Sequence, residues 1–500
     1  MNLAASSRWG SVVGLRLIVT ALLLLPLAIF LQIVGGGYAS DLNGADEASH
    51  YINGLLIHDY VAEGLPGNPI AYAIQYYIHF PKVAIGHWPP FFYVVEAAFF
   101  FPAGPSPATA LLLQAVIAAG IAALVGLVIG GVDGWLAAAG GIAVLAAPEI
   151  FGGLNNVMSD APLALLALFA ALAWARYMFE QTATWSVAFA LVAIAAILTK
   201  GDGFLLAFIP PLSIAFTGRL GLLRDWRFWL PAPIVAICTV PWYLATYHIT
   251  ADGFNYSWGL AFTAQALAAY GQFLLHLIGI PGLLFALVGA AKVLLDRDWT
   301  WEHAVGMSML TLVVGGFAFH CLVPVAIESR YLAVIIPGLV ILAFFGIDWI
   351  VRWFVVPRYV GLATACCLLV IGAGEGTYST KTSLQMSSAS AAILGATEQN
   401  PFILVGSDPN GEGAIIADVA TRDRGRTHYV VRGFKVLGSG NWMGSEYHPR
   451  FAQQDQVQRW IEENRIGWVV IDTSPPSVAW THNAQLRDVV AASLVRLAGA

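Results

Sequence analysis

Long apolar stretches recur along the first three quarters of the chain and predict membrane-spanning helices. A helix needs about 20 apolar residues to cross the hydrocarbon core of a bilayer. Eleven stretches approach this length, and several are short: 11–34, 107–130, 134–150, 160–178, 185–200, 203–217, 229–247, 266–292, 303–323, 331–351 and 358–376. The pattern predicts that residues 1–376 are mainly α-helical and form a polytopic transmembrane bundle of about eleven spans.

The pattern changes after residue 376. Residues 377–394 are rich in serine and threonine, as expected for a linker. In residues 395–500, strand-like apolar runs alternate with helical stretches near 412–421 and 452–464. The runs lie at 401–407, 427–433 and 467–473. This alternation predicts a small α/β domain with a mainly parallel sheet.

Charged side chains are scarce, and their distribution favours membrane spans. Only 11% of the residues are charged and 58% are hydrophobic, whereas soluble domains carry roughly 25% charged residues. If the N-terminus is cytoplasmic, ten basic residues fall on the inner side: Arg8, Arg16, Arg176, Arg219, Arg224, Arg227, Lys292, Arg297, Arg352 and Arg358. Four fall on the outer side: Lys82, Lys200, Arg330 and Lys381. This positive-inside bias places the loop 35–106 and everything after residue 376 outside.

The composition also limits the class of partner. No basic patch or run indicates a nucleic-acid partner. The cysteines lie in apolar segments without a ligand-like spacing, at Cys238, Cys321, Cys366 and Cys367. They indicate neither a disulfide framework nor a thiolate metal site. The topology and the bacterial character of the chain predict a multi-pass protein of a bacterial inner (plasma) membrane, with an extracytoplasmic C-terminal domain.

The long outer loop 35–106 carries an acidic pair, Asp46 and Glu47, soon after the first span. A carboxylate at the mouth of a membrane bundle costs solvation energy unless it is used or well paired. A helix is expected to follow Asp46. Its carboxylate is then either a helix cap or a general base that takes a proton from an acceptor hydroxyl or amine.

Two other outer segments combine polar residues with prolines. The sequence His87-Trp88-Pro89-Pro90 is either an interfacial aromatic turn or a place where His87 meets a phosphate or a carboxylate. Asp160 enters the fourth span just before Pro162. It is either a helix N-cap or an acid at the outer face.

Cations also lie at predicted outer ends of spans. Lys200, between Thr199 and two nearby glycines, either snorkels or holds a phosphate. Arg330 either pairs with Glu328 or grips an anionic lipid head group. Pro241-Trp242-Tyr243 ends the seventh span on the same side. Acids and cations thus share one membrane face by loop charge alone, and this convergence indicates a functional site.

The ordered set of motifs resembles membrane-embedded glycosyltransferases of the GT-C type. It is most similar to family 39, the branch of protein O-mannosyltransferases and lipid A aminoarabinose transferases. The shared motifs, over about residues 10–376, are Asp46-Glu47, Pro89-Pro90-Phe91-Phe92-Tyr93, Asp160-Ala161-Pro162-Leu163, Lys200-Gly201, Pro241-Trp242-Tyr243 and Arg330-Tyr331. One departure is Trp88, because the aminoarabinose-transferase branch often has lysine directly before the two prolines.

The resemblance implies an inverting glycosyltransferase. Such an enzyme moves a monosaccharide from a polyprenyl-phosphate donor to a lipid, glycan or protein acceptor at the outer face. Asp46 would be the base of a catalytic acidic set that includes Glu47 and Asp160. Lys200 and Arg330 would hold the donor phosphate, whose leaving charge needs stabilisation. The other substrate-binding residues would be Lys82, His87, Trp242, Tyr243 and Tyr331, with His87 or Lys82 replacing the missing lysine.

The sequence leaves the cofactor and one alternative function open. No cofactor is certain. A divalent cation is compatible with the oxygens of Asp46, Glu47 and Asp160, whereas the nearest branch implies chemistry without a metal. The alternative function is a transporter or flippase of lipid-linked intermediates. A transporter would place ionisable residues near the middle of the membrane, whereas these lie at span ends.

The resemblance does not cover residues 395–500. Acceptor or carbohydrate binding is the expectation for this domain. Three aromatic residues would offer stacking faces: Trp442, Tyr447 and Trp468.

Overall fold

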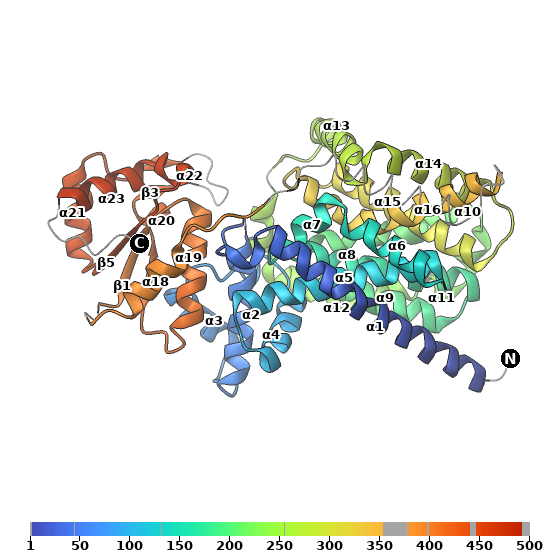
Figure 1. Ribbon diagram of the computed structural model, residues 1–500, viewed down its shortest axis with the longest axis horizontal. Helices are drawn as coiled ribbons and strands as arrows, with labels where there is room; N and C mark the ends of the chain where they lie inside the picture. Colours follow the sequence, from blue (N-terminus) through green and yellow to red (C-terminus); the bar gives the residue numbers. More distant parts are fainter. Residues whose placement is uncertain are drawn as a thin grey trace. The chain divides into compact units, whose positions relative to one another are not determined.

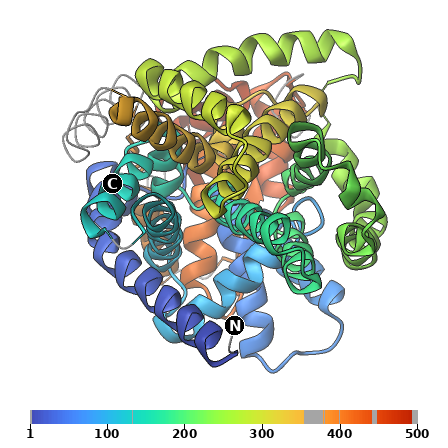
Figure 2. The same ribbon diagram turned by 90° about the vertical axis from the view of Figure 1, so that its right-hand side faces the viewer.

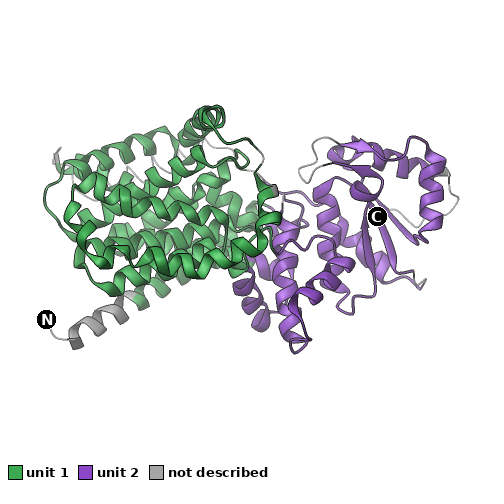
Figure 3. Cartoon of the chain, turned by 180° about the vertical axis from the view of Figure 1, so that it is seen from behind, with its two compact units in different colours: residues 1–35, 86–92, 112–379 green, residues 36–85, 93–111, 380–500 purple. Residues whose placement is uncertain are grey.

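The computed structural model describes residues 3–44, 46–131, 133–254, 256–353, 378, 380–397, 400–440 and 447–492 (Figure 1). The chain divides into two compact units (Figure 3). The membrane unit comprises residues 1–35, 86–92 and 112–379, and the loop unit comprises residues 36–85, 93–111 and 380–500. Most of the long outer loop therefore groups with the C-terminal segment. The predicted domain boundaries at residues 376 and 395 stay predictions.

The membrane unit is built from apolar helices that run side by side (Figure 2). Six helices of the described residues are long and apolar enough to cross a membrane: Gly14–Val34, Pro107–Gly130, Asp160–Glu180, Trp226–Thr250, Trp301–Leu322 and Ser329–Arg352. Each corresponds to a predicted span. Two bent pairs raise the number of candidate spans to at most eight. They are α6 (Gly134–Leu145) with α7 (Pro148–Asn155), bent by 73°, and α13 (Leu260–Leu277) with α14 (Gly279–Leu295), bent by 101°.

The helical bundle is as predicted, but the count of about eleven spans is not confirmed. The stretch predicted as one span at 266–292 is broken at Gly279, between α13 and α14. The φ of Gly279 is +69°, which the interior of a right-handed α-helix does not accommodate. Helix α9 (Ala183–Ile197) is short for a bilayer. The next stretch is divided between a 3-10 helix, η2 (Gly201–Phe208), and α10 (Ile209–Thr217). The predicted span 358–376 lies outside the described residues.

Helix α8 (Asp160–Glu180) lies in the core of this unit, packed against α9 and α15 (Trp301–Leu322). Its buried side chains are mostly small, including Ala164, Ala167 and Ala171. Small residues let neighbouring backbones approach in a membrane bundle. The Ser308 hydroxyl of α15 accordingly reaches the backbone oxygen of Ala171 at 2.5 Å. The other elements are α1 (Leu3–Val34), α5 (Pro107–Gly130), η3 (Leu220–Arg224), α11 (Trp226–Trp229), α12 (Pro231–Thr250), η4 (Ala251–Gly253), η5 (Ser329–Ile335) and α16 (Ile336–Trp353).

Helices α14 and α16 cross at two glycines. A Cβ at Gly289 would lie 1.9 Å from the backbone oxygen of Leu342, and one at Gly346 would lie 2.1 Å from that of Phe285. Neither position has room for a side chain, so the two backbones touch directly. Packing of this kind replaces the hydrophobic effect, which does not act between helices in lipid.

We expect Gly289→Ala to destabilise the membrane unit by about 1–3 kcal/mol, because the new methyl group overpacks the α14–α16 contact. The matched control is Gly271→Ala on α13, where a Cβ would meet nothing within 4 Å. The midpoint of thermal unfolding in detergent measures both variants. Equal midpoints for the two alanine variants would contradict the close backbone contact.

The loop unit begins with η1 (Gly37–Ala39) and three helices, α2 (Glu47–Ala62), α3 (Pro69–His79) and α4 (Phe91–Ala103). Helix α3 starts where Asn68 accepts hydrogen bonds from the backbone N–H groups of Ile70 and Ala71, at 2.8 and 3.2 Å. Pro69 follows at the first helical position, where its missing N–H costs nothing.

The C-terminal part of the loop unit has the predicted parallel sheet. Its strands are β1 (Phe402–Gly406), β2 (Tyr429–Arg432) and β5 (Trp468–Ile471), in the order β2-β1-β5. Ile403 pairs with Val430 on one side and with Trp468 on the other, both in parallel register. The two predicted helices are α19 (Pro409–Arg422) and α21 (Gln454–Glu463). The remaining elements are α18 (Met386–Leu394), α20 (Gly433–Val436), β3 (Gly438–Ser439), β4 (His448–Pro449), α22 (Pro475–Val478) and α23 (Thr481–Ala492).

Candidate functional site

A buried lysine in the membrane unit is held by two carboxylates. Lys200 Nζ lies 2.7 Å from Oδ1 of Asp160 and 3.0 Å from Oδ2 of Asp202. Asp160 is the first residue of α8, and Lys200 directly precedes η2. The three side chains are only 9–12% exposed. Asp160 and Lys200, predicted separately from sequence, are therefore one ionic cluster.

Two aromatic rings join this cluster to the second predicted cation. The Tyr331 ring centre lies 4.2 Å from Lys200 Nζ and 5.4 Å from the guanidinium carbon of Arg330. His320 of α15 is fully buried, and its ring stacks on the ring of Tyr331 with the centroids 5.8 Å apart. A cation over an aromatic face is stabilised by the ring quadrupole. The ring of Tyr331 thus lies close to both cations of the predicted phosphate site.

Arg330 also pairs with a neighbouring carboxylate. Its Nε lies 2.5 Å from Oε2 of Glu328, and the Glu328 side chain is 41% exposed. Of the carboxylates that hold the two cations, Glu328 is therefore the easiest to displace. An incoming anion that replaces Glu328 on Arg330 would break fewer buried contacts than one that replaces Asp160 or Asp202 on Lys200.

The predicted lipid or sugar contacts lie in the same unit. The hydroxyl of Tyr243 donates to the backbone oxygen of Ile197 at 3.0 Å. The same hydroxyl would lie 3.6 Å from a Cβ placed at Gly201, the residue after Lys200. Trp242 is half-buried on α12. His87 is packed edge-on against Trp88, with ring centroids 4.8 Å apart.

The acidic pair of the outer loop is divided into two different environments. Asp46 precedes α2 with a φ of +64°, in the left-handed region, and its side chain makes no capping hydrogen bond. Non-glycine residues adopt this conformation at a cost and often at functional sites. The cap that local sequence offered as an alternative for Asp46 is therefore absent.

Glu47 is fully buried and paired. Both its carboxylate oxygens lie within 2.9 Å of Lys381 Nζ, and Oε2 also accepts the backbone N–H of Gly44 at 2.9 Å. The Lys381 side chain is only 8% exposed. The Glu47 carboxylate therefore accepts hydrogen bonds at both of its oxygens. This ion pair fastens the start of α2 to the segment that precedes α18.

Lys82 packs against α19 rather than extending into water. A Cβ at Gly413 would lie 3.2 Å from Lys82 Cε and 3.0 Å from the Cβ of Ala48. Burial, reinforced by the charge of Arg432, lowers the pKa of Lys82 to about 8, although the nearby carboxylates, Glu412 foremost, act in the opposite direction. Lys82 is thus a lysine whose charge changes close to neutral pH.

This low pKa makes a signed prediction for stability. Between about pH 8 and the ordinary lysine value of 10.5 the unfolded chain binds a proton at Lys82 that the folded chain lacks. Stability therefore rises with pH in this window, by less than about 1.4 kcal/mol per unit because the side chain keeps some contact with water. We expect Lys82→Met to be more stable than wild type at pH 7 and the difference to shrink towards pH 10. Thermal unfolding midpoints across this range test it, and a pH-independent difference would contradict it.

Sequence reasoning missed four residues that the structure brings to these places. Asp202 stands between the two glycines that follow Lys200, and no role was predicted for it. Lys381 was counted only as an outer charge. His320 and Glu149 lie in apolar stretches that offered no motif. Glu149 lies on α7, which packs against η5, the element that carries Arg330. Only charge inside a predicted span would have singled out His320 and Glu149.

The aromatic residues predicted as stacking faces of the C-terminal domain are mostly used inside it. Trp468 is 5% exposed, and its indole N–H donates to the backbone oxygen of Asn400 at 3.0 Å. The expectation of an open face at Trp468 is therefore wrong. Tyr447 packs edge-on against Trp480, with centroids 4.8 Å apart. Trp442 lies outside the described residues.

Within the described residues, no three histidine, cysteine, aspartate or glutamate side chains are grouped so as to hold a metal ion. Glu47, one of three residues considered for a cation, has both oxygens on Lys381.

Comparison with known proteins finds similarity at the level of structure. No protein-family model and no curated protein sequence matches the chain. The crystal structure of ArnT from Cupriavidus metallidurans bound to undecaprenyl phosphate is similar with a TM-score of 0.54 and 16% identity, over 90% of this chain and 89% of that one. Its apo form gives 0.53 at the same identity and coverage.

A second kind of enzyme is also similar. The oligosaccharyltransferase of Archaeoglobus fulgidus, in complex with zinc and sulfate, has a TM-score of 0.51 and 13% identity, over 83% of this chain and 62% of that one. At these identities the comparisons concern the fold. Both similar proteins have the GT-C fold. The chain, with its bundle of apolar helices, long first loop and small C-terminal sheet, therefore has the GT-C fold.

Proposed function

We propose that the chain is an integral-membrane inverting glycosyltransferase of a bacterial inner membrane. It would move a monosaccharide from a polyprenyl-phosphate donor to a lipid, glycan or protein acceptor at the outer face. The observation that carries the proposal is the pair of cations, Lys200 and Arg330, around the ring of Tyr331. The similarity to ArnT, solved with undecaprenyl phosphate, supports a lipid phosphate as the ligand class.

The donor phosphate would bind between the two cations. It would displace Glu328, the exposed partner of Arg330, while Asp160 and Asp202 keep Lys200 in place. As the bond between the sugar and the phosphate breaks, negative charge grows on the leaving polyprenyl phosphate. Fixed cations stabilise that charge without a proton transfer.

Asp46 would deprotonate the acceptor. The hydroxyl or amine of the acceptor loses a proton to the Asp46 carboxylate and attacks the anomeric carbon of the sugar from the side opposite the phosphate. This attack inverts the configuration at that carbon. The uncapped, left-handed Asp46 supports this role. Glu47 would hold the start of α2 through Lys381 instead of reacting. Asp160 would orient Lys200.

The direct test uses the purified full chain in nanodiscs with a panel of radiolabelled polyprenyl-phosphate sugars. We expect release of free polyprenyl phosphate from at least one donor, with the same rate in EDTA. An inverted anomeric product would identify single displacement. Transbilayer movement of the intact donors without any cleavage would overturn the proposal and favour a flippase.

A further inference from the structure

Helix α2, which begins directly after Asp46, is contacted along its length by the C-terminal part of the same unit. At its first turn, Ala48 lies against Gly413 of α19. One turn later, the Tyr51 hydroxyl lies 2.9 Å from Oγ1 of Thr421, at the end of α19. The two helices therefore pack side by side.

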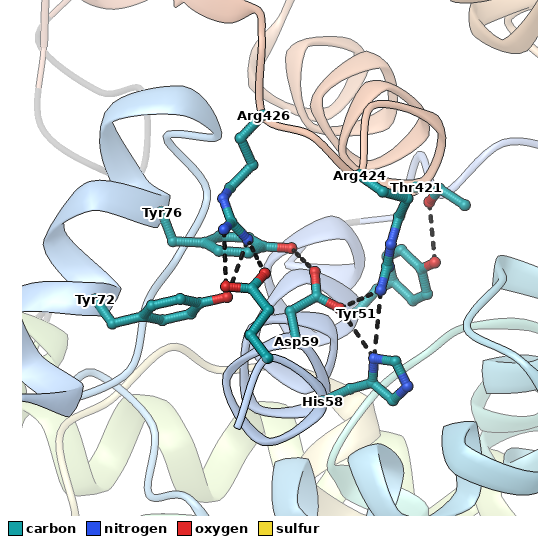
Figure 4. A network of polar contacts seen from close by, with 9 residues as sticks. Tyr51, His58, Asp59, Tyr72, Tyr76, Thr421, Arg424 and Arg426 are labelled. Atoms are coloured by element: carbon teal, nitrogen blue, oxygen red, sulfur yellow. Dashed lines mark hydrogen bonds and ion pairs between the residues drawn. The ribbon is translucent and has the colours of Figure 1, made fainter. Parts of the chain in front are cut away.

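Two arginines after α19 hold the other end of α2 (Figure 4). Arg424 forms an ion pair with Asp59, whose side chain is 5% exposed. Arg426 binds Glu63 with two parallel hydrogen bonds, of 2.7 and 3.0 Å. Parallel N–H···O pairs fix direction as well as distance, which a lysine does not do.

Tyrosines of α3 complete the contact. Tyr76 donates to Oδ2 of Asp59 at 3.0 Å, and the Tyr72 hydroxyl accepts from Arg426 at 2.9 Å. The guanidinium carbon of Arg426 lies 5.2 Å from the ring centre of Tyr72 and 5.6 Å from that of Tyr76. The hydrogen bond from Arg426 holds the pKa of Glu63 below its usual range, so the pair persists at neutral pH. This set of side chains is called the arginine clamp below.

We infer that the C-terminal domain acts as a positioning element for Asp46: Arg424 and Arg426 fix helix α2, so that its first turn presents the carboxylate in one geometry. This inference rests on the proposed function, which assigns the base role to Asp46. It gives the domain a part in the transfer reaction itself rather than in separate carbohydrate binding. The Glu47–Lys381 ion pair holds the near end of α2 and the arginine clamp holds its far end. Loosening the far end therefore leaves the helix that follows the strained turn at Asp46 held at one end only.

The test compares Arg426→Ala, Arg424→Ala and Arg426→Lys in the full chain, with Arg459→Ala as the matched control. Arg459 makes an exposed ion pair with Asp455 in the same domain, at 2.6 Å, and contacts no part of α2. Hydrogen exchange of the α2 amides and the steady-state rate of donor cleavage are measured for each. Exchange reports local opening independently of any enzymatic activity.

We expect the two alanine variants to speed exchange in α2 and to lower kcat between about tenfold and a hundredfold, because a small misplacement of a catalytic group is costly. The donor KM should stay near that of wild type. Arg426→Lys should be faster than Arg426→Ala but slower than wild type. The double exchange Glu63→Arg/Arg426→Glu should protect the α2 amides from exchange more than Arg426→Lys does. The Arg459→Ala control should match wild type.

The clamp and the proposed function fail in different ways. If wild type cleaves donor and the alanine variants show control-like exchange and kcat, the clamp is wrong and the function stands. If no donor is cleaved by wild type, the proposed function fails, and the exchange data alone decide whether the arginines hold α2. Should Arg424→Ala not fold because the buried Asp59 loses its arginine, the milder Arg426→Lys decides between the outcomes.

Discussion

Asp46→Asn is expected to lower the rate of sugar transfer by about 10²–10⁴-fold, the range that general-base catalysis usually contributes. Asparagine keeps the size of the side chain and tolerates the left-handed backbone at φ +64°, so folding should be unchanged. The side chain loses its negative charge and its ability to accept a proton. Donor affinity should therefore persist while kcat collapses.

The matched control for this prediction is Asp41→Asn. Asp41 lies in the same loop, and its carboxylate accepts the backbone N–H of Leu384 at 2.7 Å. An asparagine oxygen can still accept that bond, and no chemistry is assigned to Asp41. Transfer of radiolabelled sugar measures both variants. Activity of Asp46→Asn equal to that of Asp41→Asn would sink the assignment of the base.

The second large effect is expected at Lys200. Lys200→Met removes the partner of two buried carboxylates and should destabilise the membrane unit by about 3–5 kcal/mol, the usual result of breaking a buried ion pair from one side. It should also abolish donor binding. Loss of folding alone would give the same lack of activity, so the single variant does not separate the two causes.

The triple variant Lys200→Met/Asp160→Asn/Asp202→Asn separates them. It removes the uncompensated charges and should regain most of the thermal stability, because a neutral cluster of similar volume is tolerated. Transfer should remain absent, since the cation for the phosphate is gone. The control is Lys292→Met, which removes a lysine that lies beside the ring of Phe345 and has no role in the proposed phosphate site. A triple variant that transfers sugar at the wild-type rate would exclude Lys200 from phosphate binding.

Much of the fold could be read from local pattern. The predicted span 107–130 is α5, and the predicted start of a span at Asp160 is the first residue of α8. The three predicted strands of the C-terminal region are those of the parallel sheet. These features depend on apolar runs and on helix-start residues, which act over a few neighbouring positions. Bends were missed, because Gly279 breaks an apolar run without changing its hydropathy.

The candidate site divides in the same way. The sequence by itself determined which residues are candidates for chemistry, because carboxylates and lysines at the ends of apolar runs are costly and therefore conspicuous. Only the tertiary structure decided which partner each one contacts. Glu47 meets Lys381 across 334 positions, and Lys200 meets Asp160 across 40. No local pattern encodes a partner so distant, since that pairing is set by how the helices pack.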